Sequence, residues 1–190
     1  MVIIVSSCNC NNGQSSKSTF EKVDIEAILS QKENLLPEMC DIVSLKDLAQ
    51  IFKLDESEII KRNTTPSESN PKQRTCFFKW EDPNYPNTAI MVQALRNPLG
   101  DEYPNYIVEI MNTKRQNGEN TMNGDGPNLF SDIESMADEA IYNADIGKYF
   151  WRFSDKVLFH LAFNTNHSNS EQLEMATKLG DKMIENYLEL

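Results

Sequence analysis

The chain has 190 residues, with 18 Lys and Arg against 29 Asp and Glu, which gives a formal net charge of −11. So acidic a chain lacks the basic face that sequence-independent nucleic-acid binding needs, and no nucleic-acid partner is expected. The same charge argues against electrostatic docking on anionic lipid. Hydrophobic residues make up 39%, without an apolar run near the ~20 residues of a membrane span, so we expect one globular domain.

The N-terminus contains a short apolar run that ends at Val5 and is followed by Ser6, Ser7 and Cys8. This tetrapeptide resembles the lipobox of bacterial lipoproteins, in which a branched residue and small residues precede a lipidated cysteine. A full secretory signal also needs basic residues and roughly 7–15 apolar residues. We therefore expect the leader to extend upstream of Met1, with residues up to Cys8 as its remnant. The alternative is a short apolar terminus of a cytosolic protein.

Residues 9–19 are polar apart from Cys10, to which the sequence assigns no role. Such a segment cannot repay the entropy of ordering, so it is predicted to be a flexible tether. Lipid on Cys8 would supply the membrane as a partner, at about 0.8 kcal/mol for each buried CH₂ group. The globular domain is expected to span residues 20–190.

Two further cysteines, Cys40 and Cys76, lie in the globular part. The spacing of the four cysteines does not fit a zinc site, and no metal site is predicted. In an exported protein, Cys40 and Cys76 are the natural disulfide pair. Closing a loop of roughly 35 residues would contribute on the order of 3–4 kcal/mol. In a cytosolic protein they would instead be two buried thiols.

The first half of the domain combines helices with one hairpin. Apolar spacing predicts a helix near residues 20–30, and a clearer helix begins after Ser44, which is a good N-cap. Asp55 is expected to cap a short turn. Residues 63–73 are predicted to be a polar loop. Residues 76–95 are then expected to form a hairpin of two strands, because they are rich in aromatic and β-branched side chains.

The second half repeats this arrangement. A helix is predicted after Pro104, and a second over residues 131–141, where Ser131 and Glu134 have the spacing of a capping box. Alternating apolar residues over 149–164 predict a second hairpin. A final amphipathic helix is expected to begin at Ser168.

The order of these elements predicts an α+β fold, with an antiparallel sheet built from two hairpins (76–95 and 149–164) and packed helices. The Cys40-Asp41 helix start, the aromatic strand Cys76–Trp80 and the segment Met136–Tyr142 resemble small bacterial lipoproteins of unknown function with a PsbP/Mog1-like sandwich. The resemblance implies a lipid-anchored, non-catalytic domain with a Cys40–Cys76 bridge. No cofactor is expected.

Residues that could carry chemistry are few. His160 and His167 are the only histidines, and the sequence has neither a G-x-S-x-G nucleophile elbow nor an H-E-x-x-H zinc motif. Tyr85 and Tyr103, in proline-flanked loops, are candidates for an exposed aromatic binding surface. Trp80 is expected to be in the core.

Three functions remain open from the sequence. The preferred hypothesis is a non-catalytic lipoprotein domain of the bacterial cell envelope, periplasmic or surface-exposed, that binds a protein or small ligand. The alternative is an acidic cytosolic immunity or inhibitor protein that masks a basic partner through its negative field. The third is a hydrolase that uses His160 or His167.

Overall fold

The computed structural model describes residues 36–64, 72–120, 126–135, 137–153 and 155–189. The expected lipidation site at Cys8, the tether and the helix near residues 20–30 lie outside these ranges.

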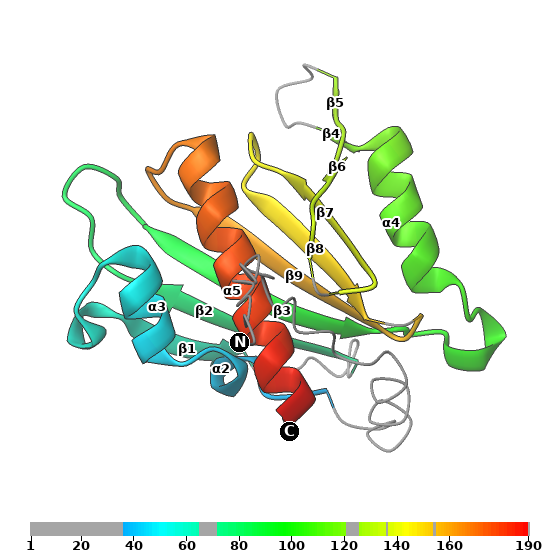
Figure 1. Cartoon of the computed structure of the whole chain (residues 1–190), viewed down its shortest axis with the longest axis horizontal. Coiled ribbons are helices and arrows are strands. Elements are labelled where there is room, and N and C mark those ends of the chain that lie inside the picture. The colour runs from blue at the N-terminus through cyan, green and yellow to red at the C-terminus, as the bar shows by residue number, and fades with distance from the viewer. Residues whose placement is uncertain (1–35, 65–71, 121–125, 136, 154, 190) are drawn as a thin grey trace, which may run out of the picture.

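The described chain forms an α+β fold around an antiparallel sheet of seven strands (Figure 1). The strand order is β1-β2-β3-β9-β8-β7-β6. Both predicted hairpins are confirmed as β2–β3 and β8–β9, and pairing of β3 with β9 joins them at the centre of the sheet. The strands are β1 (Ile60–Thr64), β2 (Gln73–Lys79), β3 (Ala89–Arg96), β6 (Ser131–Asp132), β7 (Glu139–Asn143), β8 (Lys148–Phe153) and β9 (Val157–Asn164).

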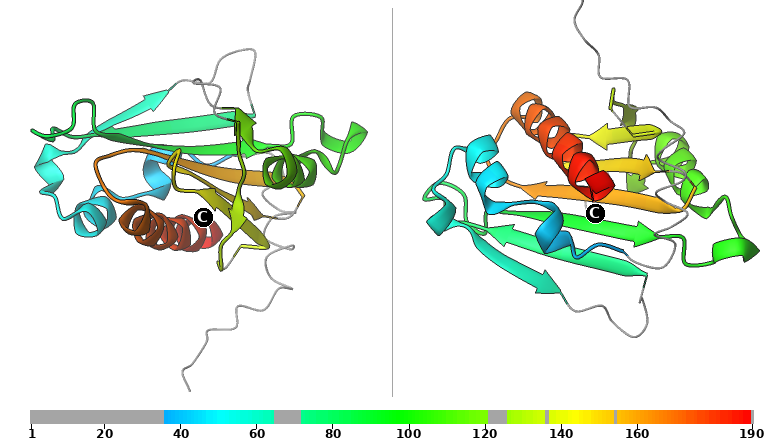
Figure 2. Two further views of the ribbon diagram at one scale, coloured as in Figure 1. Left: turned by 90° about the horizontal axis from the view of Figure 1, so that it is seen from above. Right: turned by 60° about the horizontal axis from the view of Figure 1, so that its bottom comes forward.

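Helices cover both faces of the sheet. The long helix α5 (Asn169–Glu189) crosses one face, with α2 (Met39–Ile42) and α3 (Leu45–Phe52) beside it (Figures 1 and 2). Helix α4 (Tyr106–Asn117) packs on the opposite face, against β7, β8 and β9. The remaining short elements are the 3-10 turns η1 (Glu56–Glu58) and η2 (Gly100–Glu102) and a small ladder of β4 (Glu119–Asn120) with β5 (Pro127–Asn128).

Alternation along the strands separates two cores. On β8, Tyr149, Trp151 and Phe153 point to the face covered by α5, whereas Phe150 points to α4. The larger core also contains the apolar stripe of α5 and Trp80, which was expected in the core and is 7% exposed. The sheet is therefore an apolar layer with helices on each side, as the strand patterns predict.

Predicted caps are confirmed, including Asp55 at the start of η1. The Ser44 hydroxyl accepts a hydrogen bond from the Asp47 amide at 3.0 Å, which caps α3. Before α5, the Glu171 carboxylate accepts from the Ser168 amide at 2.9 Å and the Ser168 hydroxyl accepts from the Glu171 amide at 3.4 Å. This reciprocal pair is the capping box expected from the sequence.

The predicted helix over residues 131–141 is wrong. Residues 131–132 form β6 and residues 139–143 form β7. Ala140 and Ile141 suit a helix by spacing, but in β7 they point to opposite faces and enter the two different cores. Burial on both faces and pairing with β8 outweigh the local helical pattern.

Strand β1 was not predicted. Its sequence, Ile60 to Thr64, is mostly polar, and Ile60 is 66% exposed, so it carries no alternating apolar signal. It forms because it pairs with β2 at the edge of the sheet, from Ile60 opposite Lys79 to Thr64 opposite Thr75. Lys61 and Arg62 place charges on this edge, a usual protection against strand-to-strand association.

Close packing of α5 on β8 depends on Gly180. A Cβ atom at Gly180 would lie 2.5 Å from Cε2 and Cζ2 of the Trp151 indole. Both residues are buried, so neither can move aside freely. The small residue thus lets the helix backbone approach the largest side chain of the core.

Replacing Gly180 with Ala should destabilise the protein by about 1–3 kcal/mol, although Ala favours helices over Gly by about 1 kcal/mol. The reason is overpacking against Trp151. Urea unfolding followed by circular dichroism measures the change.

A double-mutant cycle supplies the control. Trp151→Phe removes the outer part of the indole, including Cζ2, so Gly180→Ala should cost less in that background. An equal loss of stability in both backgrounds would contradict this account of the packing.

Candidate functional site

A disulfide joins Cys40 of α2 to Cys76 of β2, across 36 positions of sequence. Their Cα atoms lie 5.1 Å apart, within the range that a disulfide requires. Cys40 is 5% exposed and Cys76 is fully buried, in the core between the sheet and the helices. The structure thus brings together the two cysteines that the sequence analysis paired, in oxidised form.

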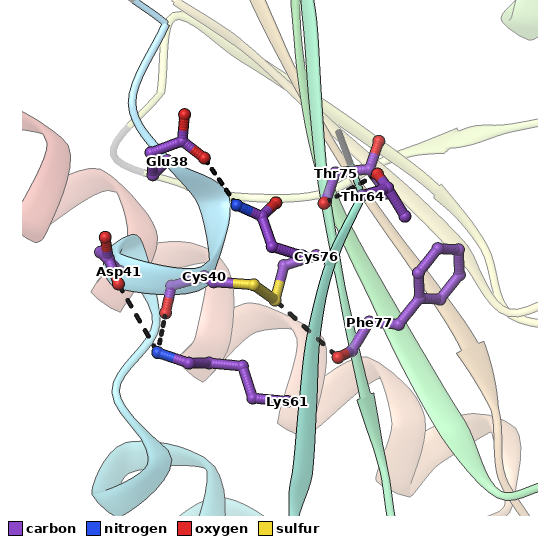
Figure 3. The surroundings of a disulfide bond; sticks show 9 residues. Glu38, Cys40, Asp41, Lys61, Thr64, Thr75, Cys76 and Phe77 are labelled. Carbon is purple, nitrogen blue, oxygen red and sulfur yellow. Dashed lines mark hydrogen bonds and ion pairs between the residues drawn. A yellow bond between two sulfur atoms is a disulfide. The ribbon is translucent and has the colours of Figure 1, made fainter. Parts of the chain in front are cut away.

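Polar contacts around the bridge tie α2 to the edge strand β1 (Figure 3). The Lys61 ammonium donates to the Cys40 carbonyl at 3.3 Å and lies 3.6 Å from the Asp41 carboxylate. The Asn63 amide donates to the Glu38 carboxylate at 2.8 Å. Covalent and polar links therefore act together on the first described segment of the chain.

Tyr85 and Tyr103 do not form a common surface. Tyr85 lies in the turn before β3, where its hydroxyl contacts Asn164 at 3.2 Å, and it is only half-exposed. Tyr103, 37% exposed, follows the opposite end of β3 and packs edge-on against Tyr106. The eight residues of β3 separate them, a span of roughly 25 Å along a strand.

The two histidines lie on opposite faces of the sheet. His160 stacks on Phe150 on the α4 side, with ring centroids 4.3 Å apart. His167 lies edge-on to Phe52 on the side of α3 and α5, with centroids 6.0 Å apart. They cannot act in one site, and Cys40 and Cys76, being bonded to each other, offer neither of them a thiol.

His160 is held neutral by its surroundings. Burial, reinforced by the positive charges of Lys148 and Lys114, lowers the pKa of His160 to about 3. Its Nε2 is inaccessible and has no hydrogen-bond partner in the described part of the chain. A base this weak is poorly matched to proton transfer near neutral pH.

A charged cluster lies beside His160. The Glu119 carboxylate pairs with both Lys114 and Lys148, and the Lys114 ammonium lies 4.1 Å from the centre of the Phe150 ring. Burial acts to raise the pKa of Glu119, but hydrogen bonds from the two lysines outweigh it and hold that pKa below its ordinary value. The cluster fastens α4 and β4 to β8, and its two lysines outnumber the one carboxylate.

The described ranges contain neither a candidate metal site nor a candidate membrane span. No group of three or more His, Cys, Asp or Glu side chains there is placed to hold a metal ion. None of the helices there is long and apolar enough to cross a membrane.

A cavity of about 550 Å³ opens at the end of the sheet where β2 begins and β3 ends. Four cations line it, against two acids, in a chain whose net charge is −11. Apart from these charged residues, the wall has one polar side chain, one glycine and two apolar residues. The lining residues are Leu36, Lys72, Arg74, Arg96, Asn97, Gly100, Asp101, Pro104, Asp155 and Lys156.

Strand alternation explains why these cations converge. On β2, Arg74 pairs with Ala94 and shares the core-facing side with Cys76, and Arg96 continues the row of Ala94 on β3. The rows are apolar where the helices cover them and cationic where the strands reach the end of the sheet. Lys156 is added by the turn before β9.

One buried side chain, Asn97, shapes the rim of the cavity. Its amide donates to the Tyr103 carbonyl at 2.8 Å, and its oxygen accepts from the amides of Leu99 and Gly100 at 2.9 and 3.1 Å. Asn97 is 6% exposed. The loop that contains η2 is therefore held in one shape, and Gly100 adopts a positive φ of 57° within it.

Sequence reasoning missed this cavity. The predicted hairpin covers residues 76–95, so Arg74 and Arg96 lie just beyond its ends, where β2 and β3 extend further than expected. The position of the turn that carries Lys156, beside this end of the sheet, could not be read from local pattern. The site depends on contacts between segments distant in sequence.

The neutral state of His160 predicts a pH dependence. Its folded pKa of about 3 lies below the ordinary value near 6.5, so between these pH values the unfolded chain binds a proton that the folded chain does not. The free energy of unfolding should therefore fall as pH drops below 6.5. At pH 5 this one group should remove about 2 kcal/mol.

Urea unfolding of the wild type and of His160→Phe at pH 7, 6 and 5 measures this contribution. Phe keeps an aromatic ring against Phe150 and cannot take up a proton. The variant should lose less stability than the wild type between pH 7 and pH 5. Parallel pH profiles for the two proteins would show that His160 is not the responsible group.

Comparison of the chain with models of protein families, with curated proteins and with solved structures finds no match.

Proposed function

We propose that this chain is a non-catalytic binding domain of the bacterial cell envelope, anchored in a membrane by lipid on Cys8. The bridge between Cys40 and Cys76 carries the proposal. Protein disulfides persist in oxidising compartments and are rare in a reducing cytosol. This bridge joins two cysteines 36 positions apart, and Cys76 is fully buried. Both features suit a permanent structural disulfide.

The same proposal includes the type of fold. A sheet with helices on both faces, and a bridge from a helix start to β2, fit the PsbP/Mog1-like sandwich of the lipoproteins that the sequence resembles. The order of strands and the position of α4 are the features to compare with a member of that group.

Three observations favour binding over catalysis. His160 has its pKa lowered to about 3, so it is a weak base. Cys40 and Cys76 are used in the bridge. The cavity at the end of β2 and β3 offers cations, which can recognise an anionic ligand.

Export predicts a defined chemical state in the native bacterium. Mass spectrometry of the full protein under non-reducing conditions should find diacylglycerol on Cys8 and a peptide pair linked through Cys40 and Cys76. Cys8→Ser should move the protein from the membrane to the soluble fraction and leave its bridge intact. Cys10→Ser is the matched control and should remain in the membrane fraction.

The alternative function makes the opposite prediction. An acidic cytosolic inhibitor of a basic partner would carry free thiols at Cys40 and Cys76 and no lipid. Finding this state in the native bacterium would overturn the envelope proposal.

Removing the bridge should destabilise the domain by about 3–4 kcal/mol, because the unfolded chain regains the freedom of a long loop. The variant Cys40→Ala/Cys76→Ala avoids placing hydroxyl groups in the core. Urea unfolding measures the loss. Dithiothreitol should lower the stability of the wild type and leave that of the double variant unchanged; equal responses would contradict a stabilising bridge.

A further inference from the structure

The cavity at the end of β2 and β3 is positively charged within an acidic protein. Lys72, Arg74, Arg96 and Lys156 face Asp101 and Asp155 there, an excess of two positive charges. One of the two acids is also engaged with a residue outside the cavity. Asp155 is already paired with Arg152 at 3.0 Å, and Arg152 does not line the cavity.

The four cations differ in the partners that they have inside the protein. The Lys72 ammonium donates to the carbonyls of Asn97 and Pro98 at 3.3 and 3.1 Å, which satisfy its hydrogens but not its charge. Arg74 has an ion pair with Glu38 at 3.3 Å.

Arg96 has no ion pair among the residues that the structure describes. It is half-buried, and its guanidinium also makes no hydrogen bond with another side chain in that part of the chain. A half-buried guanidinium is a strong donor to a planar or tetrahedral anion, because two of its N–H groups can bind together.

We propose that this cavity binds the phosphate group of a small, hydroxylated phosphate monoester. The inference deepens the proposed function, since it rests on the domain being a binder and names the class of its ligand. A doubly charged phosphate matches cations that converge from β2, β3 and the turn before β9. A volume of about 550 Å³ is within the usual size of small-molecule sites and exceeds what one phosphate fills.

The rest of the wall indicates what the phosphate is attached to. Asp101 and Asp155 are acceptors that would suit hydroxyl groups, and the carbonyl and amide groups around Asn97 are polar as well. Only Leu36 and Pro104 offer apolar contact. A polyol phosphate therefore fits this wall better than a phosphate on an apolar chain.

Isothermal titration calorimetry of the oxidised full chain at constant ionic strength tests the proposal with three probes. Glucose 6-phosphate should bind saturably, inorganic phosphate should bind at least tenfold more weakly, and glucose should not bind. Equal binding of both phosphates would overturn the monoester as ligand, and saturable binding of glucose would overturn the role of the cations.

Variants locate the binding to the cavity. Arg96→Gln should weaken glucose 6-phosphate binding at least tenfold, and Arg96→Lys should give an intermediate loss, since it keeps the charge without the paired donors. Arg62→Gln on the exposed edge strand β1 removes the same charge outside the cavity and should change affinity less than twofold. Equal losses for Arg96→Gln and Arg62→Gln would overturn the site.

These experiments distinguish a loss of binding from a loss of folding. The thermal midpoint of each unliganded variant shows whether it folds, and Arg96→Lys serves if Arg96→Gln does not. Absence of phosphate binding by a folded wild type would overturn this inference while leaving the lipid on Cys8 and the Cys40–Cys76 bridge untouched. A missing bridge would instead refute the envelope proposal.

Discussion

The covalent bond between Cys40 and Cys76 fixes the part of the chain on which both proposals depend. Helix α2 has four residues and no side-chain cap, so it is far too short to be stable by itself. The bridge holds it against β2. The same short segment supplies Leu36 to the wall of the cavity and Glu38 to the ion pair with Arg74. Loss of the bridge would therefore affect the binding site as well as stability.

Cations gather at the end of the sheet because strand alternation continues beyond the cover of the helices. Residues in the core-facing rows are apolar under α2 and α5, and a further apolar residue at the end would face water. Arg74 and Arg96 occupy those positions instead. Like charges in one cavity repel each other, which favours any ligand that neutralises them. Glu38 offsets part of the charge of Arg74, whereas Asn97 positions the rim without adding charge.

The sequence was informative where one face of an element is buried. Alternation found β2, β3, β8 and β9, and capping residues found α3 and α5, because these signals are local. It failed for β7, where Ala140 and Ile141 enter different cores. It failed also for β1, whose existence depends on an edge partner. Local sequence also gave no distance between Tyr85 and Tyr103, because they lie at opposite ends of β3.

Net charge and local charge act over different distances. A formal charge of −11 repels an approaching anion, but salt at ~0.1 M screens exposed charges beyond about 10 Å. Inside the cavity the ligand would meet Arg96 and Lys72 at contact distance, where screening by salt is weaker. The negative field of the whole protein would not accelerate the association of an anionic ligand. A high affinity would therefore depend on a low dissociation rate. Selectivity for the ligand would then depend on the shape of the rim that Asn97 holds and on the paired N–H donors of Arg96. It would not depend on the net charge of the protein.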